Sequence, residues 1–401
     1  MTKKSDAPAI RFKGFSDAWE QRKFEEIAVR SSVICSDDTL PRVEYEDIVS
    51  GTGRLNKDIY AKQSIKSGIA FHQGDVLYGK LRPYLQNWLL PTFDGLAVGD
   101  FWVLQPQNAD SSFLYRLIQS RQFDEVANQS TGTKMPRADW KLVSKTVFSI
   151  PSNISEQAAI GTYFTALDSL ITLHQRKFEK LTNVKKSMLE KMFPQKGSSY
   201  PEIRFKGFTD PWEQRKLGEM GQTYTGLSGK TKDDFGHGQA RFVTYMNVFS
   251  NPISNPEMTE PIEIDPKQNE VEVGDVFFTT SSETPEEVGM SSILLEKRGK
   301  TYLNSFCFGF RPSEKIDSYY LAYMLRSEST RAKIILLAQG ISRYNISKNK
   351  VMEIAVSLPS LDEQKMIGQY FSQLDNLITL HQRELEKLQN IKKSMLEKMF
   401  V

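Results

Sequence analysis

The chain has 401 residues, of which 39% are hydrophobic and 25% charged, with a formal net charge of +3. This composition predicts a globular protein of two or three domains and excludes a strongly basic, histone-like protein. The two isolated cysteines and four histidines predict a reducing, cytoplasmic location and no metal site in the chain itself. The sequence has no signal-peptide core and no run of eighteen apolar residues, which predicts no membrane partner.

The first predicted element is a basic, aromatic segment that occurs twice. IRFKGFSDAWEQRK begins at Ile10 and IRFKGFTDPWEQRK begins at Ile203, with 12 of 14 positions identical. A segment shared by both copies cannot distinguish two different ligands. We interpret these opening segments as packing at the start of two duplicated units, or as equivalent docking positions for two copies of a partner.

The regions that follow the opening segments share little sequence but keep a common framework. GDVLYGK at Gly74 parallels GDVFFTT at Gly274, and FSIPSNISEQ parallels VSLPSLDEQ farther along. The runs RVEYEDIV, ARFVTYMNVF and EVEVGDVFFTT favour strands, whereas SSFLYRLIQS and DSYYLAYMLRSE favour helices. The pattern predicts α+β domains in which one scaffold carries two different surfaces.

A long helix follows each of these regions. The segments that begin at Glu156 and Glu363 are identical at 28 of 38 positions and contain no proline. Apolar residues spaced alternately by four and three form one narrow stripe, which is typical of a coiled-coil seam. The seam residues that we expect are Phe164, Leu167, Ile171, His174, Phe178, Leu181, Phe371, Leu374, Ile378, His381, Leu385 and Leu388.

Each helix needs a partner, because an isolated helix of about 57 Å with one apolar stripe is marginally stable in water. The other copy is the obvious candidate. Parallel pairing would require the chain to return along the whole helix, so we predict an antiparallel pair with a pseudo-two-fold axis. The expected divisions are a first variable domain (1–153), the first helix and its linker (154–196), a second variable domain (197–360) and the second helix (361–401).

Two pairs of side chains in the helices have alternative interpretations. His174 and His381 occupy equivalent seam positions, where they could form a pH switch or a metal pair, or could simply fix the register. The lysine pairs 185–186 and 392–393 could contact phosphates or a partner, or could form a solvated face.

Motifs for chemistry are incomplete. TGLSGKT ends like a phosphate-binding loop, but Tyr224 stands where the first glycine of that loop is required. NPIS at Asn251 lacks the second proline of a methyltransferase N-P-P-[YF] loop, and no Pro-Asp pair begins a nuclease motif. Neither cysteine has an evident base partner. We predict a non-catalytic chain.

The sequence resembles the specificity subunit of type I DNA restriction–modification enzymes over nearly its whole length. The resemblance rests on GDVLYGKLRPYLQN, WEQRKLGEM and LPSLDEQKMIG, and on the paired EQ…IG…LD.LI…KL…KK..ML segments. It implies that each recognition domain reads one half of a split, asymmetric double-stranded DNA target, and that the helices set the spacer. It also implies docking of two adenine methyltransferase (modification) subunits and of restriction/translocase subunits. S-adenosylmethionine, ATP and Mg²⁺ are then expected on those partners, with no cofactor in this chain.

Loops that mix basic, aromatic and amide side chains are the candidate DNA contacts, because such groups bind phosphates and base edges. The expected DNA-binding residues are Lys80, Arg82, Tyr84, Gln86, Asn87, Lys134, Arg137, Ser228, Lys230, Lys232, Ser342, Arg343, Tyr344, Asn345 and Lys348. Ordinary surface charge is the alternative for some of them. Two other functions stay open: a scaffold that bridges two proteins without reading DNA, and a self-sufficient nuclease or methyltransferase with an unfamiliar site.

Overall fold

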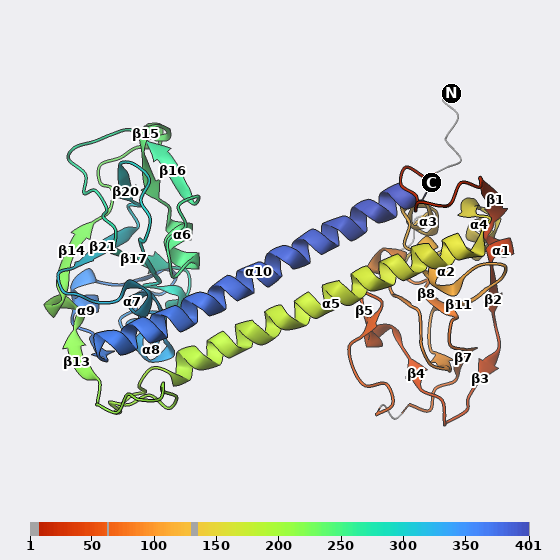
Figure 1. The fold of residues 1–401 in the computed structure, drawn as a ribbon, viewed down its shortest axis with the longest axis horizontal. Helices are drawn as coiled ribbons and strands as arrows, with labels where there is room; N and C mark the ends of the chain where they lie inside the picture. Colours follow the sequence, from red (N-terminus) through yellow and green to blue (C-terminus); the bar gives the residue numbers. More distant parts are fainter. Residues whose placement is uncertain (1–7, 62–63, 130–134, 401) are drawn as a thin grey trace. The chain divides into compact units, whose positions relative to one another are not determined.

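The computed structural model describes residues 8–61, 64–129 and 135–400. The chain forms two compact units, the first made of residues 1–175 and 382–401 and the second of residues 176–381. Two long helices, α5 (Ile154–Lys191) and α10 (Leu361–Met399), each contribute one half to each unit (Figure 1). The first helix was expected to reach Phe193. It ends at Lys191, and Phe193 precedes Pro194, which disfavours helical geometry in the residue before it.

The first unit contains two four-stranded sheets and the short helices around them. One sheet is antiparallel with the order β2-β11-β8-β9, and the other has the order β3-β7-β10-β4 with β10 and β4 parallel. Its elements are β1 (Trp19–Lys23), α1 (Phe24–Ile27), β2 (Ala28–Ser31), β3 (Ile34–Cys35), β4 (Arg42–Val43), β5 (Ile48–Val49), β6 (Arg54–Leu55), β7 (Gly68–Phe71), β8 (Val76–Gly79), β9 (Trp88–Leu89), β10 (Gly95–Ala97), β11 (Phe101–Pro106), α2 (Ser111–Leu117), α3 (Arg121–Ala127), α4 (Trp140–Lys145) and β12 (Val147–Pro151).

The second unit repeats this plan with different details. Its main sheet has the order β14-β21-β17-β19, and a second sheet, β16-β15-β20, again contains one parallel pair. Its elements are β13 (Glu213–Lys216), β14 (Gly221–Thr225), β15 (Phe235–Val243), α6 (Tyr245–Ser250), β16 (Thr259–Ile262), β17 (Val276–Thr279), β18 (Ser281–Ser282), β19 (Ser291–Ile293), β20 (Thr301–Leu303), β21 (Cys307–Pro312), α7 (Ser318–Met324), α8 (Glu328–Ile335), β22 (Tyr344–Asn345), α9 (Lys348–Met352) and β23 (Ala355–Leu358).

The predicted strand runs are only partly correct. ARFVTYMNVF is a strand as far as Val243, and then α6 begins, because the Thr244 side chain caps the helix by accepting a hydrogen bond from the Asn247 backbone N–H. EVEVGDVFFTT contributes only β17, and a turn precedes it at Gly274. Local capping and turn chemistry overrode the β-propensity of these residues.

The opening segments fasten each domain to the start of its long helix. Arg11 donates to both carboxylate oxygens of Glu156 at 2.6 and 2.7 Å, and Arg204 does the same to Glu363 at 2.7 and 2.8 Å. The end of each opening segment is a strand: β1 pairs with β12 and β13 pairs with β23, in both cases antiparallel. The two opening segments therefore pack each domain against its long helix. This agrees with the interpretation of these segments as packing at the start of each unit.

The glutamine after each of these glutamates completes the attachment. Gln157 accepts from the Asp110 backbone N–H at 2.9 Å, and Gln364 accepts from the Asp317 N–H at 3.0 Å. Asp110 and Asp317 are the N-caps of α2 and α7. The repeated Glu-Gln pair thus joins the opening segment to the helix that covers the main sheet.

The two long helices pair antiparallel inside each unit. In the first unit Phe164 at the start of α5 packs in one core with Met399 at the end of α10, and Phe400 stacks on Phe113 with ring centroids 5.6 Å apart. In the second unit Phe371, near the start of α10, packs in one core with Met192. Each pair carries one ion pair across it, Lys392 with Asp168 (2.7 Å) and Lys185 with Asp375 (2.5 Å). The predicted α+β class and antiparallel pairing are confirmed.

Candidate nucleic-acid interface

Two candidate loops of the first domain lie side by side. Leu81 and Arg137 form an isolated antiparallel β-bridge. The Arg82 N–H donates to the Pro136 carbonyl at 2.7 Å, and the Ala138 N–H donates to the Lys80 carbonyl at 2.9 Å. The stretch GKLRPYLQN and the described end of TGTKMPRADW therefore form one surface. Lys134 lies outside the described residues.

The fold separates the candidate side chains of this surface into two groups. Lys80 and Arg137 form ion pairs with Asp100, at 3.5 and 3.1 Å, and Asn87 is buried. These three side chains support the loop, although Arg137 is still 54% exposed and accessible to a ligand. In contrast, Arg82 and Tyr84 are exposed and Gln86 is half-buried, and none of the three side chains forms a hydrogen bond or ion pair within the described ranges.

Tyr45 anchors the backbone of this loop through two hydrogen bonds. Its hydroxyl donates to the Asp100 carbonyl at 2.7 Å and accepts from the Leu81 N–H at 2.8 Å. Burial raises the pKa of Tyr45 well above its ordinary value, so the phenol stays protonated and can make both bonds. Tyr45 and Asp100 were not predicted from the sequence, and no pattern of spacing could have connected them to Lys80.

The equivalent surface of the second domain includes a segment that sequence reasoning missed. β18 pairs with β22, so that Ser281 lies opposite Asn345 and Ser282 opposite Tyr344. This is the same relation as that of Leu81 to Arg137, because β18 follows the GDVFFTT framework as Leu81 follows GDVLYGK. Continuing the framework alignment by a few residues would have found the missed segment, residues 280–283.

The candidate side chains of this second surface differ from those of the first. Ser342 and Arg343 are exposed, and the Arg343 guanidinium carbon lies 5.8 Å from the centroid of the Phe306 ring, which is itself 54% exposed. Asn345 is exposed and hydrogen-bonded through its backbone to Gln339, and Lys348 begins α9. A hollow beside them is lined by Tyr245, Met246, Phe249, Ser281, Ser282, Glu283, Glu287, Ser342 and Arg343.

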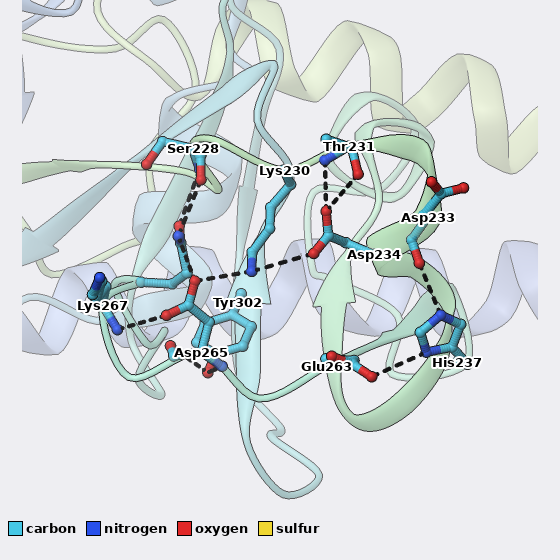
Figure 2. Close-up of polar contacts among 11 residues, drawn as sticks. Ser228, Lys230, Thr231, Asp233, Asp234, His237, Glu263, Asp265, Lys267 and Tyr302 are labelled. Atoms are coloured by element: carbon cyan, nitrogen blue, oxygen red, sulfur yellow. Dashed lines mark hydrogen bonds and ion pairs between the residues drawn. The ribbon is translucent and has the colours of Figure 1, made fainter.

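The remaining candidates, in GLSGKTK, form a separate and largely self-contained loop. Figure 2 shows the Lys230 ammonium between two carboxylates, Asp265 at 2.9 Å and Asp234 at 3.7 Å, with only 12% of the side chain exposed. The hydrogen bond to Lys230 is the largest of the causes that lower the pKa of Asp265. Ser228 exchanges two bonds with the Gln268 side chain through its backbone, at 3.0 and 3.1 Å, and Lys232 is exposed. Lys230 therefore holds the loop together.

A groove of about 500 Å³ lies in the first unit between the recognition domain and the helix pair. Its lining combines amide, aromatic and charged groups, including Gln86, Trp88, Arg54, Arg121 and Lys393. Asp124, Asp168 and Glu397 also line it, so the charges are mixed. The candidate residue Gln86 thus shares this groove with side chains of the helix pair.

The twelve predicted seam residues are all buried or half-buried, whereas Leu170, Leu173, Leu377 and Leu380 beside them are 44–51% exposed. His174 and His381 are half-buried and each has interactions with its surroundings. Across the described ranges, no group of three or more His, Cys, Asp or Glu residues could hold a metal ion. Nor is any helix in them both long and apolar enough to span a membrane.

Comparison with known proteins places these features in a family. A family model described as the type I restriction modification DNA specificity domain matches residues 32–183 and 209–390, which is well over half of the chain. The chain belongs to this family. The resemblance inferred from the sequence is therefore confirmed, and recognition of a DNA target within a type I restriction–modification system is the function of such a subunit.

Individual relatives agree with this membership. The chain is 24% identical over 341 residues to the type I restriction enzyme MjaVIII specificity subunit of Methanocaldococcus jannaschii, a match that covers 78% of this chain and 77% of the relative. It is 25% identical over 185 residues to the EcoDI specificity subunit of Escherichia coli, over 44% of this chain and 41% of that one.

Solved structures share the fold. The S subunit of a type I restriction–modification system from M. genitalium has a TM-score of 0.57 at 15% identity, with 98% of this chain and 99% of that chain covered. A chain from a study of complex assembly and conformational transition of the type I R-M system has a TM-score of 0.53 at 17% identity, covering 94% and 96%. The two-domain specificity-subunit fold therefore extends over nearly the entire chain.

Proposed function

We propose that the recognition domains, residues 1–153 and 197–360, each read one half of a split, asymmetric double-stranded DNA target. The observation that carries this proposal is the pairing of equivalent segments with different side chains. The bridge between Leu81 and Arg137 and the pairing of Ser281 with Asn345 occupy the same place in the two scaffolds. One surface offers arginine, tyrosine and glutamine, whereas the other offers serine, asparagine and a ring-supported arginine. Two different half-sites require such a difference.

In this proposal the long helices α5 and α10, within the expected divisions 154–196 and 361–401, set the spacer between the half-sites and dock two modification methyltransferase subunits. Support comes from the sequence LITL, which both helices contain. The first and last leucines of this sequence are exposed in both helices. They are Leu170 and Leu173 in the first unit, and Leu377 and Leu380 at the matching positions of the second. Two identical apolar pairs suit two copies of one partner, because exposed leucines at helical spacing are typical of helix-docking surfaces.

The chain itself is non-catalytic in this proposal and acts in the cytoplasm. The methyltransferase subunits bind S-adenosylmethionine, and the restriction/translocase subunits that join the complex bind ATP and Mg²⁺. The incomplete phosphate-loop and methyltransferase motifs support this division of labour. So does the role of Lys230, which binds Asp265 and Asp234 inside its own loop.

Exchange of residues 27–150 for those of a relative with a different target tests the assignment of domains to half-sites. Adenine methylation is mapped across the genome of cells that carry the chain and its partner subunits. We expect one half of the methylated motif to change and the other half to stay. A change in both halves, or in neither, contradicts the proposal.

Insertion of a heptad into α5 and α10 together tests the role of the helices. The two half-sites should be unchanged and the spacer longer, since the recognition loops are untouched. A change in the half-sites themselves would show that the helices do not act as a spacer.

Docking is tested separately with Leu170→Glu/Leu173→Glu and with Leu377→Glu/Leu380→Glu. Each double variant should lose one of two bound methyltransferase subunits in native mass spectrometry. Leu336→Glu is the matched control, because Leu336 is 84% exposed but lies on neither helix. Retention of both subunits by both variants would contradict docking at these leucines.

The alternative function, a protein scaffold that does not read DNA, makes an opposite prediction about salt. Binding that neutralises phosphates weakens steeply as salt concentration rises, and it depends on sequence only where base edges are read. A purified complex that binds its partners but shows no salt-dependent, sequence-selective DNA binding would favour the scaffold.

A further inference from the structure

One turn of the first domain has an unusual backbone. In the described residues, only three amino acids other than glycine have positive φ angles: Arg82 (49°), Gln86 (54°) and Asn108 (53°). Two of the three flank a single 3₁₀ turn, Pro83–Leu85, inside the candidate stretch GKLRPYLQN. The left-handed region is unfavourable for most residues with a Cβ, arginine and glutamine included, and is freely accessible to glycine.

The surrounding structure imposes this geometry on the turn. The Gly51 N–H donates to the Gln86 carbonyl at 3.0 Å, the Gly79 N–H donates to the Asn87 carbonyl at 2.6 Å, and the Ser50 hydroxyl donates to the Leu85 carbonyl. The Arg82 N–H is held by Pro136 from the other loop. The turn is therefore fixed at both ends before any ligand binds.

The side chains of the turn divide by direction. Pro83 and Asn87 are buried and anchor it, whereas Arg82, Tyr84 and Leu85 are exposed, and Tyr84 is 56% exposed. The guanidinium of Arg82 and the amide of Gln86 form no hydrogen bond or ion pair with the described part of the chain. A fixed backbone thus carries two side chains with bidentate hydrogen-bonding ends, of which Arg82 is exposed and Gln86 is half-buried in the lining of the groove.

Glycine would relieve the strain at both positions, yet arginine and glutamine stand there. Strain of this kind is kept where the side chain has a role that glycine cannot fill. A guanidinium pairs bidentately with guanine O6 and N7, and a carboxamide pairs with adenine N6 and N7. We propose that Arg82 reads a guanine and Gln86 reads an adenine in the half-site of the first domain, from a turn whose strained backbone fixes both side chains in advance.

This inference rests on the proposed function, and glycine variants test it without weakening the fold. Arg82→Gly and Gln86→Gly remove the reading group while making the backbone conformation more favourable. Asn108→Gly is the matched control: it makes the same change at the third left-handed position, where Asn108 is exposed outside the candidate loops. Each variant is expressed in place of the natural chain with its partner subunits, and adenine methylation is mapped across the genome.

Arg82→Gly should make one G·C position in one half of the motif degenerate, and Gln86→Gly one A·T position in the same half. Purified complexes of each variant should lose roughly ten- to a hundred-fold in discrimination at that base pair. Asn108→Gly should leave the motif unchanged.

Three outcomes would overturn the inference. The first is an unchanged motif in both glycine variants. The second is relaxation at a base pair of the other type. The third is a uniform loss of affinity for all sequences, which would make Arg82 a phosphate contact. If the natural chain itself directs no split motif, the proposed function fails instead, so the two failures are distinguishable.

Discussion

Glu156 and Glu363 are carboxylates that the fold buries almost completely, with side chains 1% exposed, and each is paired with one arginine of an opening segment. Removing one partner of a buried ion pair leaves an uncompensated charge, which typically costs 3–5 kcal/mol. We expect Arg11→Met to lower the free energy of unfolding of the first unit by about this amount. Chemical denaturation of the purified chain measures the loss.

The matched control is Arg22→Met. Arg22 pairs with Glu20 at 2.9 Å, but both side chains are about one third exposed (34% and 36%). Exposed pairs of this kind contribute about 1 kcal/mol or less. The double variant Arg11→Met/Glu156→Gln should recover part of the loss, because the buried charge is then gone. Equal effects of Arg11→Met and Arg22→Met would show that burial does not govern this contact.

The loop around Lys230 gives a prediction about pH. The hydrogen bond from Lys230 is the main cause that lowers the pKa of Asp265 below its ordinary value of 3.8. The stabilisation from Asp265 is therefore present above that value and is lost as pH falls through the lowered pKa. The same hydrogen bond raises the pKa of Lys230 above 10.5, so its contribution is lost only as pH rises through the raised value.

The contact between Lys230 and Asp265 should consequently be insensitive to pH between about 5 and 9. Backbone amide chemical shifts of Lys230 and Thr231, followed by NMR across pH 3–9, check this. In Lys230→Met the shifts should begin to move at a higher pH than in the natural chain, because the Asp265 carboxyl loses the partner that lowers its pKa. A titration midpoint above pH 5 in the natural chain would contradict the assignment.

Residue types in the sequence indicated which loops carry candidate contacts, but not which side chains remain accessible. Lys80, Arg82 and Arg137 look equivalent in the sequence, and only the fold brings Asp100 to the first and the third of them. Asp100 precedes β11, far along the chain from both loops. Lys230 was a DNA-contact candidate for its charge, and Asp265 takes up that charge from 35 residues away. Long-range ion pairs of this kind have no signature in local spacing.

At the scale of elements, the helix pair gives its own prediction. Asp375 accepts from Lys185 at 2.5 Å and from the Tyr323 hydroxyl at 2.8 Å. Exchanging the charges, Lys185→Asp with Asp375→Lys, should be tolerated, because a tyrosine hydroxyl can accept from the new lysine. The exchanged pair should lie within about 1 kcal/mol of the natural chain in free energy of unfolding, since this ion pair is partly exposed.

The same exchange in the first unit should fail. Asp168 accepts from Lys392 at 2.7 Å and also from Arg116 at 2.7 Å, and the Arg116 side chain is only 3% exposed. Asp168→Lys with Lys392→Asp would place a lysine against a buried arginine, with an expected loss of about 3–5 kcal/mol. Thermal denaturation of both exchanged chains compares them directly. Equal stability of the two would mean that Arg116 and Tyr323 do not distinguish the units.

The elements themselves were predictable in unequal measure. The long helices and their expected seam were predicted from a repeated 4–3 spacing over 38 residues. The direction of pairing was predicted from the chain path, because parallel helices would need the chain to return along the whole helix. The strands were harder, since many contain only two to four residues and alternation is too short there to read. The helix α6 was missed because one threonine cap outweighed a run of β-favouring side chains.

At the scale of the molecule, the two units differ in whether they are built from one continuous segment of the chain or from two separate segments. The second unit is continuous, residues 176–381, and contains every member of its main core, from Leu181 to Leu374. The first unit needs both ends of the chain, because Met395, Met399 and Phe400 pack on its core and the Ile10 N–H donates to the Lys398 carbonyl at 3.1 Å. Removal of residues 382–401 should therefore unfold the first unit selectively, although the cut follows the second unit directly in sequence.

Hydrogen exchange with mass spectrometry reports on both units in one sample of the truncated chain 1–381. Peptides that contain Phe113 and Phe164 should lose protection. Loss of the buried Met399 side chain alone lowers the free energy of unfolding by about 2–5 kcal/mol. Peptides that contain Phe310 and Tyr320 should keep theirs, since every core contact of these residues lies within 176–381. The isolated fragment 176–381 should fold with the same protection. Loss of protection in the second unit, in either protein, would show that its stability depends on the first.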